Sequence, residues 1–91
     1  MQPKPPIVEA AENGDIKRVK EIIKQGDFDI NATNAAGFTA ATIAAMNNNM
    51  DLLRVLVQAG ADVNKRAKNN QNAIDWARAH DNKEMLKLID K

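Results

Sequence analysis

The alternation of apolar and polar residues is clearest in the middle of the chain, in residues 37–64. It predicts a turn, a short helix over residues 39–47, a tight Asn-rich turn, a longer helix, a Gly stop and an extended exit segment. The longer helix is indicated by apolar residues spaced three and four positions apart, which form one stripe on a helix surface. That stripe consists of Met50, Leu53, Leu56 and Val57.

The stretches on either side repeat this arrangement. Upstream, the pattern predicts a short helix from Pro6 to about residue 13, because Pro is suited to a first helical turn. A second helix follows, Gly26 ends it, and residues 27–31 are expected to be extended. Downstream, a short helix is predicted over residues 72–80, with one more helix closing the chain.

The turn between the two helices of each unit falls on a residue type that tolerates left-handed backbone. The next residue is in each case a good N-cap, because its short side chain can accept backbone N–H groups at the helix start. These pairs are Gly14-Asp15, Asn48-Asn49 and Asp81-Asn82. Ala10, Ala44 and Ala77, in the three short helices, are 34 and 33 residues apart. Such a period, with two helices and a loop per unit, is typical of stacked repeat proteins.

These residues closely resemble the ankyrin repeat. The family's exit motif stands intact as Gly60-Ala61-Asp62-Val63-Asn64, its Gly-x-Thr start as Gly37-Phe38-Thr39, and its Ala pair as Ala10-Ala11 and Ala44-Ala45. The resemblance covers roughly residues 5–91. It implies an all-α ankyrin-repeat solenoid of three helix-turn-helix units, six helices in all, joined by hairpin-like loops.

The resemblance implies one domain over residues 6–91 after a flexible lead-in of residues 1–5. Repeat 1 spans about residues 6–31, repeat 2 about 32–64 and repeat 3 about 65–91. The terminal repeats of a solenoid need polar outer faces, and about three repeats are needed for stability. We therefore expect a whole small solenoid with capped ends, and a fragment of a longer stack is the alternative. The charged residues expected to solvate the ends are Glu9, Glu12, Lys17, Lys20, Lys24, Lys83, Glu84 and Lys87.

Two units depart from the family's Thr-Pro-Leu-His motif. The corresponding stretches are residues 39–42, Thr-Ala-Ala-Thr, and residues 72–75, Asn-Ala-Ile-Asp. Both lack the histidine that in the family ties neighbouring loops by hydrogen bonds. Thr42 and Asp75 stand at its position and are the polar side chains that could replace it. Asn70 stands where the third unit's loop glycine belongs, and we expect it to adopt left-handed backbone.

Composition narrows the classes of function. The chain has 91 residues, of which 44% are hydrophobic and 3% aromatic, so it builds one small domain. Its 13 basic and 12 acidic residues give a formal charge of +1, which argues against a nucleic-acid or acidic-membrane binder. The absence of cysteine excludes disulfides and thiolate metal sites. Without an apolar run of signal-peptide or membrane-spanning length, the sequence predicts a cytoplasmic, monomeric protein that does not insert into membranes.

No set of residues indicates catalysis, a cofactor or a metal site, and the chain is predicted not to be an enzyme. His80 is the only histidine and lacks the partners that catalysis or metal binding requires, so we expect it at a helix end. Asp27, Asp29 and Asp62 lack the spacing of a calcium-binding loop and are expected in turns. A phosphate-binding loop and a Ser/His/Asp set are also missing.

Three residues have two interpretations each. Trp76 is interpreted as packing between repeats rather than as part of a ligand site, and its indole N–H needs a partner. Phe38 follows the loop glycine, at a position that in ankyrin repeats commonly faces the binding groove; it is either an exposed hot spot or packed against the adjacent loop. Asn64 is expected to satisfy turn backbone groups. Its surroundings also resemble the ankyrin context that asparagine hydroxylases recognise.

The resemblance implies a module that binds a partner protein on its loop tips and on the concave face of its short helices. Nucleic acid is an unlikely partner on charge. The predicted binding residues form a small apolar patch with basic residues at one side. Such a surface suits a partner with one apolar anchor and some acidic character. The predicted protein-binding residues are Glu12, Asn13, Thr33, Ala35, Ala36, Phe38, Met46, Asn47, Arg66, Lys68, Asn69, Gln71, Ala79 and His80.

Two alternatives belong to other classes. The chain could be a structural segment of a longer solenoid without a partner of its own. The basic cluster of Lys65, Arg66 and Lys68 could instead bind an anionic ligand such as a phosphate or RNA, although a solvated loop tip is the simpler interpretation. The cluster lacks the interleaved aromatic residues that single-stranded nucleic-acid binding uses.

Overall fold

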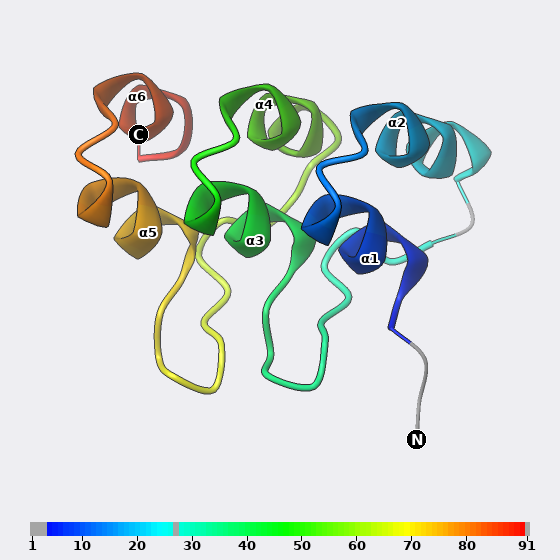
Figure 1. The fold of residues 1–91 in the computed structure, drawn as a ribbon, viewed down its shortest axis with the longest axis horizontal. Helices are drawn as coiled ribbons and strands as arrows, with labels where there is room; N and C mark the ends of the chain where they lie inside the picture. The colour runs from blue at the N-terminus through cyan, green and yellow to red at the C-terminus, as the bar shows by residue number, and fades with distance from the viewer. Residues whose placement is uncertain (1–3, 27, 91) are drawn as a thin grey trace.

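The computed structural model describes residues 4–26 and 28–90; residues 1–3 of the predicted lead-in, together with residues 27 and 91, lie outside it. The described residues form six α-helices in two layers (Figure 1). The inner layer consists of α1 (Pro6–Glu12), α3 (Ala40–Met46) and α5 (Ala73–Ala79). The outer layer consists of α2 (Ile16–Gln25), α4 (Met50–Gln58) and α6 (Lys83–Ile89).

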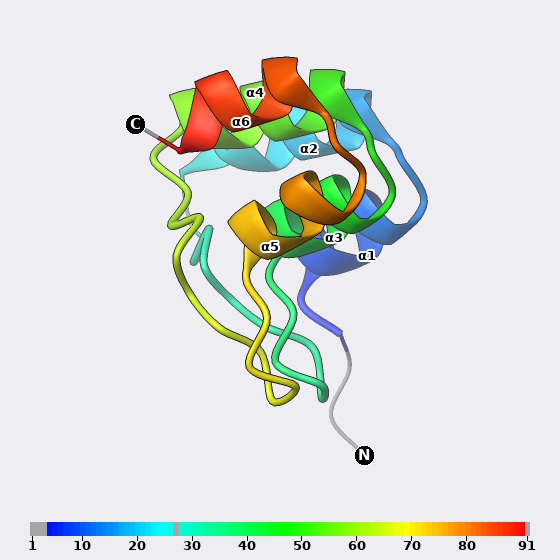
Figure 2. The ribbon, with the colours of Figure 1, turned by 90° about the vertical axis from the view of Figure 1, so that its left-hand side faces the viewer.

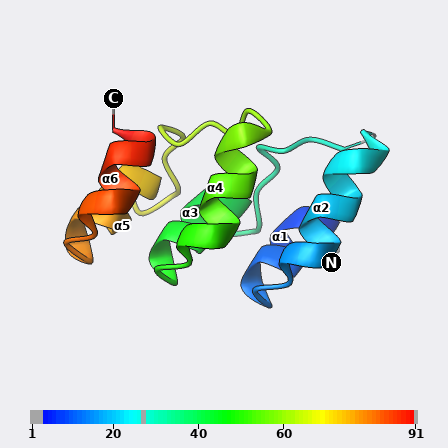
Figure 3. The ribbon, with the colours of Figure 1, turned by 90° about the horizontal axis from the view of Figure 1, so that it is seen from above.

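Each inner helix pairs with the outer helix that follows it, and the three pairs, called repeats 1 to 3, stack along one direction (Figures 1 and 3). Two long loops connect the repeats and extend beyond the inner layer (Figure 2). The inner helices contact one another along the stack, with α3 between α1 and α5. The predicted all-α repeat solenoid is therefore confirmed.

The predicted turn and N-cap pairs are present in all three repeats. Each turn residue adopts left-handed backbone, with φ of 67° at Gly14, 57° at Asn48 and 52° at Asp81. The next residue accepts the backbone N–H group three positions on, at 3.1 Å for Asp15, 3.2 Å for Asn49 and 3.0 Å for Asn82. Each outer helix therefore starts with one of its orphan N–H groups satisfied.

After α2 and α4 the chain turns at residues 30–31 and 63–64, and the prediction of an extended exit segment is wrong for these residues. The backbone N–H of Ala32 donates to the Asp29 carbonyl oxygen at 3.0 Å, which closes a turn. The Asp29 carboxylate accepts the N–H of Asn31, and the Asp62 carboxylate accepts that of Asn64, each at 2.9 Å. A short Asp side chain that bonds the backbone two residues on competes with extended structure.

The loop between repeats 1 and 2 is closed by its own polar groups. The N–H of Asn34 donates to the Phe38 carbonyl oxygen at 3.1 Å, and Thr33 pairs with Thr39 in an isolated antiparallel bridge. In the second loop Asn70 has a φ of 68°. This value confirms the predicted left-handed backbone where the family has glycine.

The two loops are tied to each other by backbone groups. The N–H of Lys68 donates to the carbonyl oxygen of Ala36 at 3.1 Å. The Thr42 hydroxyl instead lies 3.0 Å from the Thr39 hydroxyl at the start of its own helix. Asp75 completes a capping box at the start of α5. Both side chains at the position of the family's histidine thus bond within their own repeat.

Alanine allows the inner helices to approach closely. Ala10, Ala44 and Ala77 are fully buried, one in each inner helix. Larger apolar residues of the outer layer, such as Leu53 and Met85, are also fully buried and fill the space between the layers. Because each repeat is thin, stability comes from contact with the neighbouring repeat rather than from a single thick core.

The two ends of the stack carry charge where the middle carries apolar residues. Ile43 is buried in repeat 2, whereas Glu9, at the equivalent position of repeat 1, is exposed. Ala45 is buried in repeat 2, whereas its equivalent Arg78 in repeat 3 is exposed and pairs with Asp90 at 3.1 Å. The neighbouring repeat accounts for this difference in burial, so the ends are polar, as terminal repeats require.

Candidate functional site

An open pocket of about 370 Å³ lies between repeats 1 and 2, where α1, α3 and the first loop meet. Three of its residues are apolar and three are polar. The lining residues are Glu12, Asn34, Phe38, Ile43, Met46 and Asn47.

Local hydrogen bonds position Phe38 at this pocket. The Asn34 side chain accepts the N–H of Phe38 at 3.0 Å and that of Ala36 at the same distance. The next residue, Thr39, caps α3 by accepting the N–H of Thr42 at 3.1 Å. Phe38 is therefore held between a closed loop and a helix start. It is half-buried against the core, which combines the two interpretations that the sequence leaves open.

The structure brings four of the predicted binding residues together at the pocket: Glu12, Phe38, Met46 and Asn47. Two lining residues, Asn34 and Ile43, are not predicted from the sequence. The signal for Asn34 is its place at the start of an Asn-Ala-Ala-Gly turn, where a short amide can bond to the backbone. The signal for Ile43 is that it is the one large aliphatic residue in an alanine-rich short helix.

Glu12 is the charged residue of the pocket. Its carboxylate lies 3.2 Å from the Lys4 ammonium group, and the two side chains are 32% and 57% exposed. An exposed ion pair of this kind is worth about 0–1 kcal/mol. A cationic group of another molecule could therefore take the place of Lys4 beside Glu12 at little cost in free energy.

Repeats 2 and 3 are tied by side chains near their helix–helix turns. His80 ends α5, as predicted, and its Nε2 donates to the carbonyl oxygen of Met46 at 2.7 Å. The Asn82 amide nitrogen donates to Oδ1 of Asn48 at 2.7 Å. In the first junction the position of Asn48 is taken by Gly14, which has no side chain to form this bond.

The first junction is tied at its opposite edge, near the exit segments. The Asn31 side chain accepts the backbone N–H of Asp62 at 2.8 Å, across 31 residues of sequence. The equivalent residue of repeat 2 is Asn64, which is exposed at the last exit segment. Its backbone N–H donates to the Asp62 carboxylate, so the Asp62 side chain bonds to this turn, and the role predicted for the Asn64 side chain stays a prediction.

Trp76 occupies in repeat 3 the position that Ile43 occupies in repeat 2. It is half-buried and packs against the core, as predicted. Its indole N–H is buried and has no acceptor among the described residues. Because an unsatisfied buried donor costs about 1–3 kcal/mol, Trp76 stabilises the stack through its apolar area alone.

The basic cluster on the second loop is partly neutralised. Arg66 donates from Nη1 to the Asn70 carbonyl oxygen at 2.7 Å and to the Asp75 carboxylate at 3.2 Å. Lys65 and Lys68 remain exposed. Arg66 thus holds the loop against its own repeat, and the cluster presents two lysines rather than three cations.

The other predicted binding residues are spread over loops and helix ends. Asn69 and Gln71 bond to each other at 2.8 Å in the second loop. Outside the pocket and apart from the basic loop, the exposed predicted residues are Asn13, Ala35, Ala36 and Ala79, and Thr33 is half-buried. The structure therefore leaves them spread over the loops and inner-helix ends, outside the pocket.

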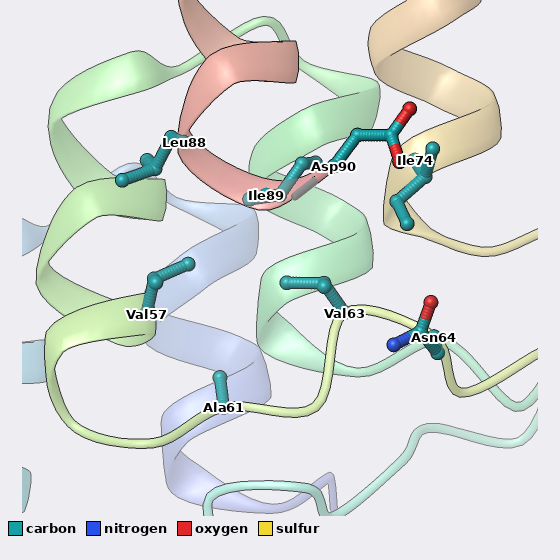
Figure 4. A pocket seen from close by; sticks show the side chains of 8 residues that line it. All are labelled: Val57, Ala61, Val63, Asn64, Ile74, Leu88, Ile89 and Asp90. Carbon is teal, nitrogen blue, oxygen red and sulfur yellow. The ribbon is translucent and has the colours of Figure 1, made fainter.

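A second pocket, of about 340 Å³, lies where α4, its exit segment, α5 and α6 meet (Figure 4). Its lining is mostly aliphatic. The residues are Val57, Ala61, Val63, Asn64, Ile74, Leu88, Ile89 and Asp90. The sequence does not indicate this pocket, because its residues come from four separate elements.

Among residues 4–26 and 28–90, no group of three His, Asp or Glu side chains is placed to hold a metal ion. None of the six helices there is long and apolar enough to cross a membrane.

Comparison with known families accounts for this architecture. The family model described as ankyrin repeats (3 copies) matches residues 7–91. The chain therefore belongs to the ankyrin repeat family, as its motifs indicate. Ankyrin repeats are in general protein–protein interaction modules, and the fold is typically non-enzymatic.

The relatives differ widely in size. The chain is 34% identical over 80 residues to the putative ankyrin repeat protein YahD of Escherichia coli (strain K12), covering 88% of this chain and 39% of YahD. It is 38% identical over 73 residues to alpha-latrocrustotoxin-Lt1a of Latrodectus tredecimguttatus, covering 80% of this chain and 5% of the toxin.

Among solved structures, a chain in the complex of the Bd0816 predatory endopeptidase from Bdellovibrio bacteriovorus with immunity protein Bd3460 matches with a TM-score of 0.80. It is 26% identical, and the match covers 96% of this chain and 47% of that chain. The chain thus spans less than half the length of each of these three proteins.

Proposed function

We propose that this chain is a non-enzymatic interaction module that binds a partner protein on its inner-helix face and loop tips. The observation that carries the proposal is the pocket of about 370 Å³ between repeats 1 and 2. It combines apolar surface for an anchoring side chain with polar groups that orient it, which is the composition of a protein-interface hot spot.

The residues of the pocket can each make a different kind of contact with the partner. Phe38 and Met46 offer half-buried apolar surface, and Met adapts its shape to different partners. Asn47 is exposed at the end of α3, where its amide can bond to partner backbone. Glu12 can pair with a basic side chain, and the exposed Lys65 and Lys68 on the second loop with an acidic one. The partner we propose therefore has an apolar anchor between groups of opposite charge.

The comparisons support a binding role. Ankyrin repeats bind protein partners, and the matched solved chain belongs to a complex of an endopeptidase with an immunity protein. The alternative role as a structural segment is less well supported, because a further repeat stacked against repeat 1 would have to bury Glu9, which has no ion pair among the described residues. Burial of such a charge is costly unless it is paired.

Site-specific photo-crosslinking tests the assigned face. Benzoylphenylalanine placed at Asn47 should form discrete adducts in an extract of the native host, and Met46→Lys should abolish them. The same probe at Glu84, exposed on α6, is the matched control and should not form these adducts. Identical adducts from both positions, or adducts at Asn47 that persist in Met46→Lys, would show that the inner face is not the binding surface.

A further inference from the structure

The formal charge of +1 hides an uneven distribution between the two helix layers. The inner helices carry one cation and three anions, a net charge of −2. The outer helices carry seven cations and three anions, a net charge of +4. The outer-layer cations are Lys17, Arg18, Lys20, Lys24, Arg54, Lys83 and Lys87, all exposed.

Three of these cations are in register. Lys20, Arg54 and Lys87 stand 34 and 33 residues apart, at the same position of α2, α4 and α6. The outer helices lie side by side (Figure 3), so equivalent positions on them place these residues in a row across the layer. Arg54 lies 3.6 Å from Asp51, and both side chains are largely exposed, so this pair leaves the row positive.

The outer layer is hollowed between α2 and α4. The groove has a volume of about 330 Å³ and is open to solvent. Its apolar surface comes from half-buried aliphatic side chains, and its exposed cations stand on α2. The lining residues are Lys20, Ile23, Lys24, Val55, Gln58 and Ala59.

We propose that this outer-helix groove is a second interaction site, separate from the inner face, and that it binds an acidic segment of a partner protein. One aliphatic side chain of the segment packs on Ile23 and Val55. Its Asp and Glu residues pair with Lys20 and Lys24, and the row that includes Arg54 attracts the segment from a distance. The groove supplies affinity through apolar contact and the cations supply selectivity for acidic sequences.

The shape of the groove favours a peptide over a bilayer. Binding to a bilayer surface requires apolar side chains that project from the protein, whereas Ile23 and Val55 are half-buried and line an open groove. A nucleic acid would leave this apolar surface unused, and it gains affinity from stacking on aromatic residues. The aromatic residues of the chain, Phe28, Phe38 and Trp76, lie outside the outer helices.

The probe for the test is a library of random peptides displayed on phage and selected against the whole chain. Enriched peptides are then synthesised and titrated into the ¹⁵N-labelled protein by NMR. The test variant is Lys20→Glu/Lys24→Glu. The matched control is Lys17→Glu/Lys83→Glu, which makes the same change in charge at exposed positions of the outer layer that do not line the groove. Circular dichroism checks that both variants keep the native helix content.

Selection should enrich acid-rich peptides that contain an aliphatic residue, with amide shifts centred on Ile23, Val55 and Gln58. Lys20→Glu/Lys24→Glu should weaken their binding about tenfold or more, and Lys17→Glu/Lys83→Glu by less than about twofold. The proposal is overturned if the enriched peptides are not acidic, or if they bind the test variant as tightly as the wild type.

Two further probes distinguish the remaining partners. Vesicles of phosphatidylcholine and phosphatidylserine and a single-stranded DNA oligonucleotide are titrated against the same variants. Neither should bind with the affinity of the selected peptides. Tighter binding of either probe that depends on Lys20 and Lys24 would assign the surface to a membrane or a nucleic acid and refute the peptide proposal.

Discussion

The backbone N–H of Lys68 donates to the carbonyl oxygen of Ala36 at 3.1 Å, and this bond joins the two long loops of the stack. It ties the loops through main-chain atoms, while Thr42 and Asp75, at the position of the family's histidine, bond within their own repeats. Main-chain ties require close approach of two backbones. Gly37 permits this approach, because a Cβ atom there would lie 3.1 Å from the Lys68 nitrogen and 3.2 Å from the Ala67 Cα.

Gly37→Ala should therefore destabilise the protein more than an ordinary glycine substitution. Gly37 has a φ of 86°, so alanine is strained there and also presses on the second loop. We expect a loss of about 2–4 kcal/mol in the free energy of unfolding, measured by urea denaturation. Gly26→Ala is the matched control: its φ is 73°, but nothing lies within 4 Å of the added Cβ. It should cost about 1 kcal/mol, and equal losses at the two sites would contradict the loop contact.

His80→Ala should loosen the junction between repeats 2 and 3. It removes the donor to the Met46 carbonyl oxygen, a bond of 2.7 Å, and should cost about 0.5–1.5 kcal/mol. Amide hydrogen exchange should become faster in α5 and α6 and change little in α1. His80→Gln retains an N–H donor and should recover part of the loss. If His80→Gln is as unstable as His80→Ala, the hydrogen bond is not the cause.

Trp76→Phe should be nearly neutral, although it removes a large part of an indole. The indole N–H is buried without an acceptor among the described residues, so its removal relieves a penalty that offsets the lost contact area. We expect a change of no more than about 1 kcal/mol for Phe. For Trp76→Ala we expect a loss of about 2–3 kcal/mol, since only part of the side chain is buried. If Trp76→Phe and Trp76→Ala lower the free energy of unfolding by similar amounts in urea denaturation, the indole N–H has a partner, such as a bound water.

A double-mutant cycle should show coupling between Arg66 and Asp75. Their charged groups lie 3.2 Å apart and are 52% and 33% exposed, so the coupling should be about 0.2–1 kcal/mol and fall with added salt. Asp75→Ala alone should cost about 1–2 kcal/mol, because it also loses the capping box with Asn72. Coupling that does not change with salt would rule out an ion pair as its source.

Whether a feature could be predicted from the sequence depends on how far apart along the chain its interacting residues lie. Asn48 forms the turn and Asn49 the N-cap through bonds to residues close by in the sequence. Both roles could therefore be predicted from residue type and from the repeat period. The exit segments are mispredicted for the same local reason, since the carboxylate of Asp29 bends a stretch whose composition favours extension. Repetition of this turn in both exits shows that it belongs to the motif itself.

The pocket and the ties between repeats depend on contacts across about one repeat. The period of 34 and 33 residues shows that His80 lies in the repeat next to that of Met46. It does not show that the ring nitrogen of His80 lies beside the Met46 carbonyl oxygen. Four residues of the inner pocket could be predicted because the family's positions nominate them. The groove between α2 and α4 could not, since Lys20 and Lys24 are interpreted from the sequence as solvated residues of a terminal repeat.

The two junctions of the stack carry these side-chain hydrogen bonds at opposite edges. Repeat 1 is fastened to repeat 2 at the exit edge, through Asn31 and Asp62, while Gly14 leaves the turn edge without the side-chain bond that Asn48 makes in the second junction. A substitution at Asn31 therefore removes a bond from the first junction alone, and one at Asn48 from the second alone, although the three repeats follow one pattern.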